Sequence, residues 1–263
     1  MKLIVVGATG LIGTEVIRQA LLHKSVTSVI VLGRRPTPPP ESVPAGPELE
    51  KFQSVTLEDF TNYTEHVKSQ LSGADACIWH NRPLLTRLYF VSRLLAITPT
   101  ASKTMDFEAV KTVCVDYVMK GFDTLKQLPR PKSGKPLRFV YASGAKAERD
   151  QTKKPWILGD YTLMRGRVET QLLDATAESG GVMETCLLRI GLVKSPERMG
   201  YITGMLAHAA AGIIGLPLID IREIGGAAVS AAVHGFDKDT LDNDELIAMG
   251  RKELREIGEE PST

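Results

Sequence analysis

The sequence predicts an α/β fold in which helices cover both faces of one parallel β-sheet. Short, uninterrupted apolar runs, which are typical of strands buried on both faces, alternate with longer segments of helical periodicity. A glycine-rich turn joins the first apolar run to the first helical segment. The 263 residues, of which 43% are hydrophobic, suffice for one large core. We therefore expect a doubly wound parallel sheet, the Rossmann fold, in a single domain over residues 1–263.

The predicted elements follow one another in regular order along the first 190 residues. Strands are expected at residues 3–6, 28–32, 52–56, 75–79, 137–142 and 183–190. Helices are expected at residues 11–22, 65–71, 107–128 and 161–178. The segment 36–47 carries six prolines, which suit neither a strand nor a helix interior, so we expect a surface loop within the domain.

Two regions depart from this alternation. Residues 82–104 form an apolar insertion with an expected helix at 84–97, too short and too charged to span a bilayer. This helix could be a lid, a contact in a homodimer, a patch that touches a membrane, or a helix packed on the core. Residues 191–263 form a small C-terminal extension, expected to cover the substrate side. Within it we expect helices at 202–214, 225–234 and 244–257, and a strand at 218–221.

The glycine turn between the first strand and the first helix predicts a dinucleotide site. Gly7 permits the tight turn, Gly10 lets the backbone approach a pyrophosphate, and Gly13 lets the helix lie against the strand. The first N–H groups of the helix would then face the anion. A glycine turn that only packs is the alternative, but the strand–turn–helix context favours the cofactor.

Two arginines follow the second strand, where a site selective for NAD normally places an acidic residue. A guanidinium of Arg34 or Arg35 would pair with the 2′-phosphate of NADP. The alternative is a pair of solvated loop arginines. We therefore expect NADP as the cofactor and consider NAD less suited.

Composition excludes several other classes of function. A formal charge of +1 gives no electrostatic case for a nucleic-acid partner.

The three cysteines lie among apolar neighbours and are expected to be reduced, in a cytoplasmic protein: Cys77, Cys114 and Cys186. The first strand begins so early that no targeting peptide is expected. No two of the five histidines have metal-ligand spacing, so no metal is expected: His23, His66, His80, His208 and His234.

Three further residues suit hydride transfer to the carbonyl of a small-molecule substrate. Ser143 follows the fifth strand at the carboxyl edge of the sheet, and Tyr161 and Arg165 share one helical face. Ser143 would hold the carbonyl oxygen, Tyr161 would donate the proton, and Arg165 would favour the tyrosinate and hold the cofactor ribose. Each residue also has an ordinary structural explanation, as a turn former or at the core edge.

These motifs together resemble the short-chain dehydrogenase/reductase superfamily. The likeness is to its atypical branch of NAD(P)H-binding, nucleoside-diphosphate-sugar-epimerase-like proteins, which includes Tat-interacting-protein-like oxidoreductases. The motifs are GATGLIG at 7–13, LGRR at 32–35, GADACIW at 73–79, VDYV at 115–118, YTLMRGRVE at 161–169 and LLRIG at 187–191. The resemblance places these residues at the cofactor: Gly7, Thr9, Gly10, Leu11, Ile12, Arg34 and Arg35. It places Ser143 and Tyr161 in the catalytic set.

Two departures from that family pattern leave several functions open. Arg165 stands where the family usually has lysine, and a guanidinium passes protons poorly. The insertion 82–104 lengthens a connection that is shorter in the family. The leading hypothesis is an NADP-dependent oxidoreductase acting on a carbonyl or related small organic substrate. The alternatives are a non-catalytic NADP(H)-binding regulator or sensor, and a sugar-nucleotide epimerase or isomerase.

Overall fold

The computed structural model describes residues 1–80, 107–130, 134–155, 159–194 and 215–261. Its centre is a seven-stranded sheet in the order β3-β2-β1-β4-β5-β6-β9, with every neighbouring pair parallel. The strands are β1 (Lys2–Val6), β2 (Ser28–Gly33), β3 (Phe52–Thr56), β4 (Ala76–Trp79), β5 (Leu137–Gly144), β6 (Met183–Ile190) and β9 (Thr240–Leu241). The prediction of a doubly wound parallel sheet is confirmed.

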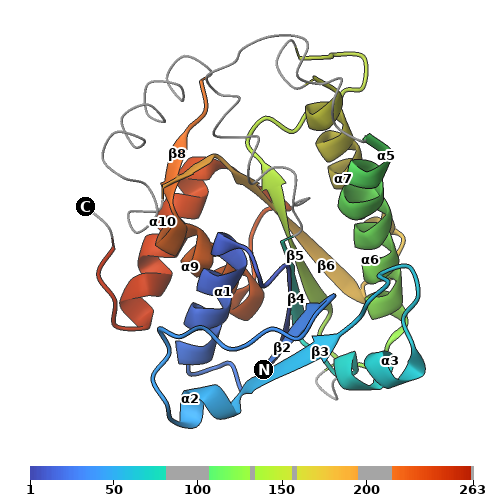
Figure 1. Cartoon of the computed structure of the whole chain (residues 1–263). Coiled ribbons are helices and arrows are strands. Elements are labelled where there is room, and N and C mark those ends of the chain that lie inside the picture. The colour runs from blue at the N-terminus through green and yellow to red at the C-terminus, as the bar shows by residue number, and fades with distance from the viewer. Residues whose placement is uncertain (81–106, 131–133, 156–158, 195–214, 262–263) are drawn as a thin grey trace.

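Helices cover both faces of this sheet (Figure 1). One face carries α1 (Leu11–Leu22), α9 (Ile221–His234) and α10 (Asn243–Glu256). The opposite face carries α3 (Glu65–Leu71), α6 (Tyr117–Gln127) and α7 (Gly159–Ala177). Two short helices, α2 (Pro47–Glu50) and α5 (Phe107–Lys111), complete the described helices, and β7 (Leu192–Lys194) pairs with β8 (Leu218–Asp220) in a small second sheet.

Alternating side chains of the central strands divide the core into two layers. Leu3 and Val5 pack with the α1–α9–α10 layer, whereas Ile4 and Val6 pack with the α3–α6–α7 layer. All four side chains are buried. Successive residues of a strand point to opposite faces, so a strand covered on both sides must be apolar throughout. This requirement explains why the strands were recognisable as unbroken apolar runs.

Several boundaries differ from the prediction. The expected helix 107–128 is divided by a π-helical turn over Thr112–Asp116, between α5 and α6. β5 continues to Gly144, so Ser143 lies within the strand rather than after it. The expected helix 225–234 begins earlier, because Asp220 and Glu223 form a capping box in which each side chain accepts from the other's backbone N–H. Strands β7 and β9 were not predicted.

The insertion 82–104, its expected helix 84–97 and the expected helix 202–214 lie wholly outside the described residues. In the described part of the chain the three cysteines are buried and form no disulfide. Burial raises the pKa of Cys77 and raises that of Cys186 to about 12, which keeps both as inert thiols. Within the described part of the chain, no helix combines the length and apolar character needed to cross a bilayer.

Candidate active site

The glycine turn lies at the point where the strand order of the sheet reverses. β1 pairs with β2 on one side and with β4 on the other, and the chain crosses between the two halves here. Ligands of open parallel sheets bind in the crevice at the carboxyl ends of such strands. Gly7 follows β1 directly, and His80, which follows β4, donates its N–H to Val6 O at 3.0 Å. The turn therefore occupies the position expected of a dinucleotide site.

Internal packing requires two of the three glycines. Gly7 has a φ of +88°, and a Cβ there would lie 1.5 Å from the carbonyl oxygen of His80. A Cβ on Gly13 would lie 2.2 Å from the carbonyl oxygen of Gly7 and 2.9 Å from Ala8 Cα. Gly7 and Gly13 thus permit the close approach of strand, turn and helix, as predicted.

Gly10 is not required in the same way. It has an extended backbone, with φ −86° and ψ 161°, which any residue adopts. Among the described residues, the nearest atom to a Cβ at this position is the carbonyl oxygen of Gly7, at an ordinary contact distance of 3.6 Å. A ligand that needs the backbone to be bare would explain glycine here, whereas packing within the described chain does not.

The first turn of α1 is open to an anion. Its N-cap, Gly10, has no side chain to accept from the helix, and the first turn contains no acidic residue. The first N–H groups of a helix have no partner within the helix itself. Among the described residues no acceptor is bonded to the N–H groups of Leu11 and Ile12, which lie at the positive end of the helix dipole. The exposed side chain of Thr9 precedes them in the turn.

Arg34 and Arg35 follow β2, which is the neighbour of β1. Both side chains are exposed, and no carboxylate in the described ranges forms an ion pair with either of them. Their charges are therefore unneutralised at the carboxyl edge of the sheet, next to the glycine turn. This placement agrees with the expected contact to a 2′-phosphate.

Ser143 belongs to a buried ionic cluster at the end of β5. Its Oγ donates to Glu169 Oε1 at 2.5 Å, and Glu169 is fully buried on α7. Arg149 Nε donates to Glu169 Oε2 at 2.8 Å, and Arg189 Nη2 donates to the same oxygen at 2.6 Å. The two guanidinium groups compensate the buried carboxylate, as a charge inside a protein requires. The Ser143 hydroxyl group therefore already donates its hydrogen bond to Glu169.

Arg165 points from α7 into the same end of β5. Its Nη1 donates to the phenol oxygen of Tyr141 at 2.7 Å, its Nη2 donates to the Ala142 carbonyl, and only 4% of the residue is exposed. Burial alone would lower the pKa of Arg165, but interaction with the phenolic oxygens of Tyr141 and Tyr161 outweighs it and the pKa is raised. Arg165 therefore remains charged and anchors α7 to β5.

The structure brings some of the predicted catalytic residues together. Arg165 and Glu169 lie one turn apart on α7 and bind successive positions of β5, which places Ser143 beside Arg165. Tyr161 is half-buried one turn before Arg165 and interacts with it electrostatically. In the sheet only β4 lies between β5 and β1, which leads into the glycine turn. The glycine turn and the three predicted catalytic residues therefore lie along the same carboxyl edge of the sheet.

The sequence reading missed the residues that hold this set in place: Tyr141, Arg149, Glu169 and Arg189. One signal was present. Glu169 lies four residues after Arg165, so it shares the face of α7 that packs on the sheet, where a charge needs a partner. The partners Arg149 and Arg189 come from a loop and from β6, and no local pattern joins them to Glu169.

Comparison with known sequences gives a match over part of the chain. No family model matches the sequence. The leucinostatins biosynthesis cluster protein T of Purpureocillium lilacinum is 28% identical over 82 residues, which are 31% of this chain and 28% of that protein. The matched stretch thus spans less than a third of either chain.

Solved structures are similar over nearly the whole chain. Vestitone reductase from alfalfa (Medicago sativa) has a TM-score of 0.61 at 14% identity, covering 92% of this chain and 76% of its own. NADPH-dependent 3-quinuclidinone reductase from Rhodotorula rubra has a TM-score of 0.62 at 13% identity, covering 94% and 91%. At these identities the likeness shows a shared Rossmann fold.

Proposed function

We propose that this chain is an NADP-dependent oxidoreductase of the atypical short-chain type, acting on a carbonyl or related small organic substrate. The observation that carries the proposal is Gly10, whose lack of a side chain is explained by a pyrophosphate against the turn. The N–H groups of Leu11 and Ile12 would bind the phosphates, and Arg34 and Arg35 would bind the 2′-phosphate. The names of the similar reductases agree with this chemistry.

When bound, the nicotinamide cofactor would supply or accept a hydride. The chain's own residues would orient the substrate and move the proton. Tyr161 would donate a proton to the carbonyl oxygen, and the fixed charge of Arg165 would lower the cost of leaving a tyrosinate behind. Ser143 would hold the same oxygen by exchanging its hydrogen bond to Glu169 for one to the substrate.

A second candidate is a non-catalytic NADP(H)-binding regulator. The internal engagement of Ser143 with Glu169, and of Arg165 with Tyr141 and Ala142, favours this candidate, because both groups already serve the fold. Such a protein would retain the glycine turn and report cofactor occupancy to a partner. Binding of the cofactor is common to both candidates, whereas turnover separates them.

Purified protein can be mixed with NADPH and a panel of ketones, aldehydes and quinones while the absorbance of the reduced cofactor is followed. We expect oxidation of NADPH with at least one substrate class, and we expect Tyr161→Phe to lower kcat while leaving NADPH affinity unchanged. Tight NADPH binding without turnover, in both the wild type and Arg165→Lys, would refute the oxidoreductase and support the regulator.

A further inference from the structure

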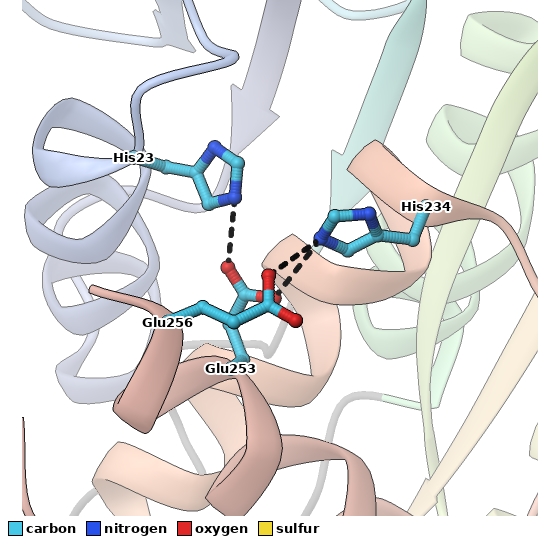
Figure 2. A group of neighbouring side chains, drawn as sticks. All are labelled: His23, His234, Glu253 and Glu256. Carbon is cyan, nitrogen blue, oxygen red and sulfur yellow. Dashed lines mark ion pairs between the residues drawn. The ribbon is translucent and has the colours of Figure 1, made fainter. Parts of the chain in front are cut away.

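Four side chains with metal-binding atoms converge at the end of α1 opposite the glycine turn (Figure 2). His23 follows α1, His234 ends α9, and Glu253 and Glu256 lie in the last turn of α10. One nitrogen or oxygen atom from each lies within 4.8 Å of the others. The sequence showed these histidines as isolated, but the fold places the rings of His23 and His234 only 5.7 Å apart.

The carboxyl ends of three helices surround this group of side chains. The C-terminal ends of α1, α9 and α10 meet here, at the negative ends of their helix dipoles. Lys51 Nζ donates to the carbonyl oxygens of Leu21 and His23 at the end of α1. Arg138 Nη1 donates to those of Ala232 and Val233 at the end of α9. A glutamate in the last turn of a helix is electrostatically unfavourable because it lies at the negative end of the dipole. The helix dipole therefore does not account for the two glutamates in the last turn of α10, both of which contact the His234 imidazole.

The carboxylate of Glu253 is buried beside two imidazole groups. The residue is fully buried, and neither of its carboxylate oxygens forms a well-aligned hydrogen bond in the described part of the chain. The nearest basic groups are two imidazoles, with His23 Nε2 3.2 Å from Oε1 and His234 Nε2 3.6 Å from Oε2. A buried charge without a hydrogen bond is costly unless it is paired or coordinates a metal.

Two distances within this group are close to those between the ligands of a tetrahedral metal. His234 Nε2 lies 3.6 Å from Glu253 Oε2 and 3.1 Å from Glu256 Oε2. Ligand atoms about 2.1 Å from a tetrahedral Zn²⁺ lie about 3.4 Å from one another. The side chains of His234 and Glu256 are 47% and 39% accessible to solvent, so water could occupy the fourth position.

His23 has a different role in the group. Its Nδ1 accepts a hydrogen bond from the backbone N–H of Ser25 at 3.0 Å, so the neutral ring carries its proton on Nε2. That nitrogen lies 3.2 Å from Glu253 Oε1. A protonated nitrogen cannot coordinate a metal, but it can hold a ligating carboxylate in place.

We propose that His234, Glu253 and Glu256 bind a divalent transition metal, Zn²⁺ in the first instance, with His23 as a positioning residue for Glu253. One imidazole and two carboxylates suit zinc, whereas Mg²⁺ and Ca²⁺ prefer oxygen ligands alone. The metal would tie the end of α9 to the end of α10. Because the group lies beyond the far end of α1 from the glycine turn, this site is structural and independent of the proposed reaction.

The test is a titration of metal-stripped, full-length protein with zinc chloride, followed by competition against a chromophoric chelator. We expect one equivalent of zinc to bind and to raise the Tm, because a ligand of the native state stabilises it. His234→Ala and Glu256→Gln, which alter exposed residues, should each weaken zinc binding at least 100-fold and abolish the shift in Tm. His66→Ala, which removes an exposed histidine on α3, is the matched control and should bind zinc as the wild type does.

Magnesium chloride in the same titration should leave the Tm unchanged. The proposal is overturned if the wild type binds no zinc at millimolar concentration. It is equally overturned if His234→Ala and Glu256→Gln retain wild-type affinity, because zinc would then be bound elsewhere.

Discussion

The glycine turn allows the requirements of folding to be separated from those of cofactor binding by two matched substitutions. Gly10→Ala adds a methyl group that meets only one described atom, at 3.6 Å. Gly13→Ala adds the same methyl group 2.2 Å from the carbonyl oxygen of Gly7. The first change therefore adds bulk where a ligand is expected, whereas the second adds it where the protein already has backbone.

The two stability changes can be estimated from these distances. Alanine is a poorer N-cap than glycine, but its smaller loss of backbone entropy compensates by a similar amount, so Gly10→Ala should change the free energy of unfolding by less than about 1 kcal/mol. Gly13→Ala forces α1 away from the turn, and overpacking of this kind should cost about 2–3 kcal/mol. Urea denaturation monitored by circular dichroism measures both.

Cofactor affinity should rank the variants differently. Gly10→Ala places its methyl group where the pyrophosphate approaches the backbone, so NADPH affinity should fall tenfold or more, equivalent to about 1.4 kcal/mol. Isothermal titration of NADPH into the folded variant measures this loss. A Gly10→Ala variant with wild-type affinity, or one as destabilised as Gly13→Ala, would refute the assignment of Gly10 to the cofactor.

Three further predictions concern charges. Glu169→Gln should lower the free energy of unfolding by about 2–3 kcal/mol, somewhat less than for a fully buried ion pair because its arginine partners are 35% and 28% exposed; an equal loss in the surface control Glu178→Gln would contradict this. Hydrogen bonds from Arg18 and Arg222 hold the pKa of Glu259 below its ordinary value of 4.5. The ionised Glu259 therefore stabilises the fold above pH 4.5, and this stabilisation is lost as the pH falls below that value. In Glu259→Gln the free energy of unfolding, measured by urea denaturation, should therefore depend less on pH below pH 4.5. An unchanged pH dependence would exclude the ion pair. Arg34→Ala should reduce the preference for NADPH over NADH about tenfold in titrations, and equal affinities in the wild type would remove the basis of the NADP assignment.

The fold could be predicted because its signals are local. The runs 3–6, 29–32 and Ala76–Trp79 of β1, β2 and β4 are buried on both faces and are therefore apolar, and the glycine turn lies within seven residues of chain. The short strand β9 was missed because its two residues carry no pattern of their own. The early start of α9 had a readable signal in Asp220 and Glu223, a capping box of three-residue spacing.

The candidate site was predictable only where its residues follow one another in sequence. Tyr161 and Arg165 share a helix face, and their proximity followed from the helical repeat. The partners of Glu169 come from a loop and a strand that meet only in the folded chain, and so do His23 and His234. Such contacts depend on how the helices pack on the sheet, which single-sequence periodicity does not specify.

The most direct test of the account is a crystal structure of the full chain grown with NADP⁺. The account predicts the pyrophosphate within hydrogen-bonding distance of the N–H groups of Leu11 and Ile12, and the 2′-phosphate beside Arg34 or Arg35. A dinucleotide bound elsewhere on the chain, or a glycine turn that remains empty at saturating NADP⁺, would contradict it.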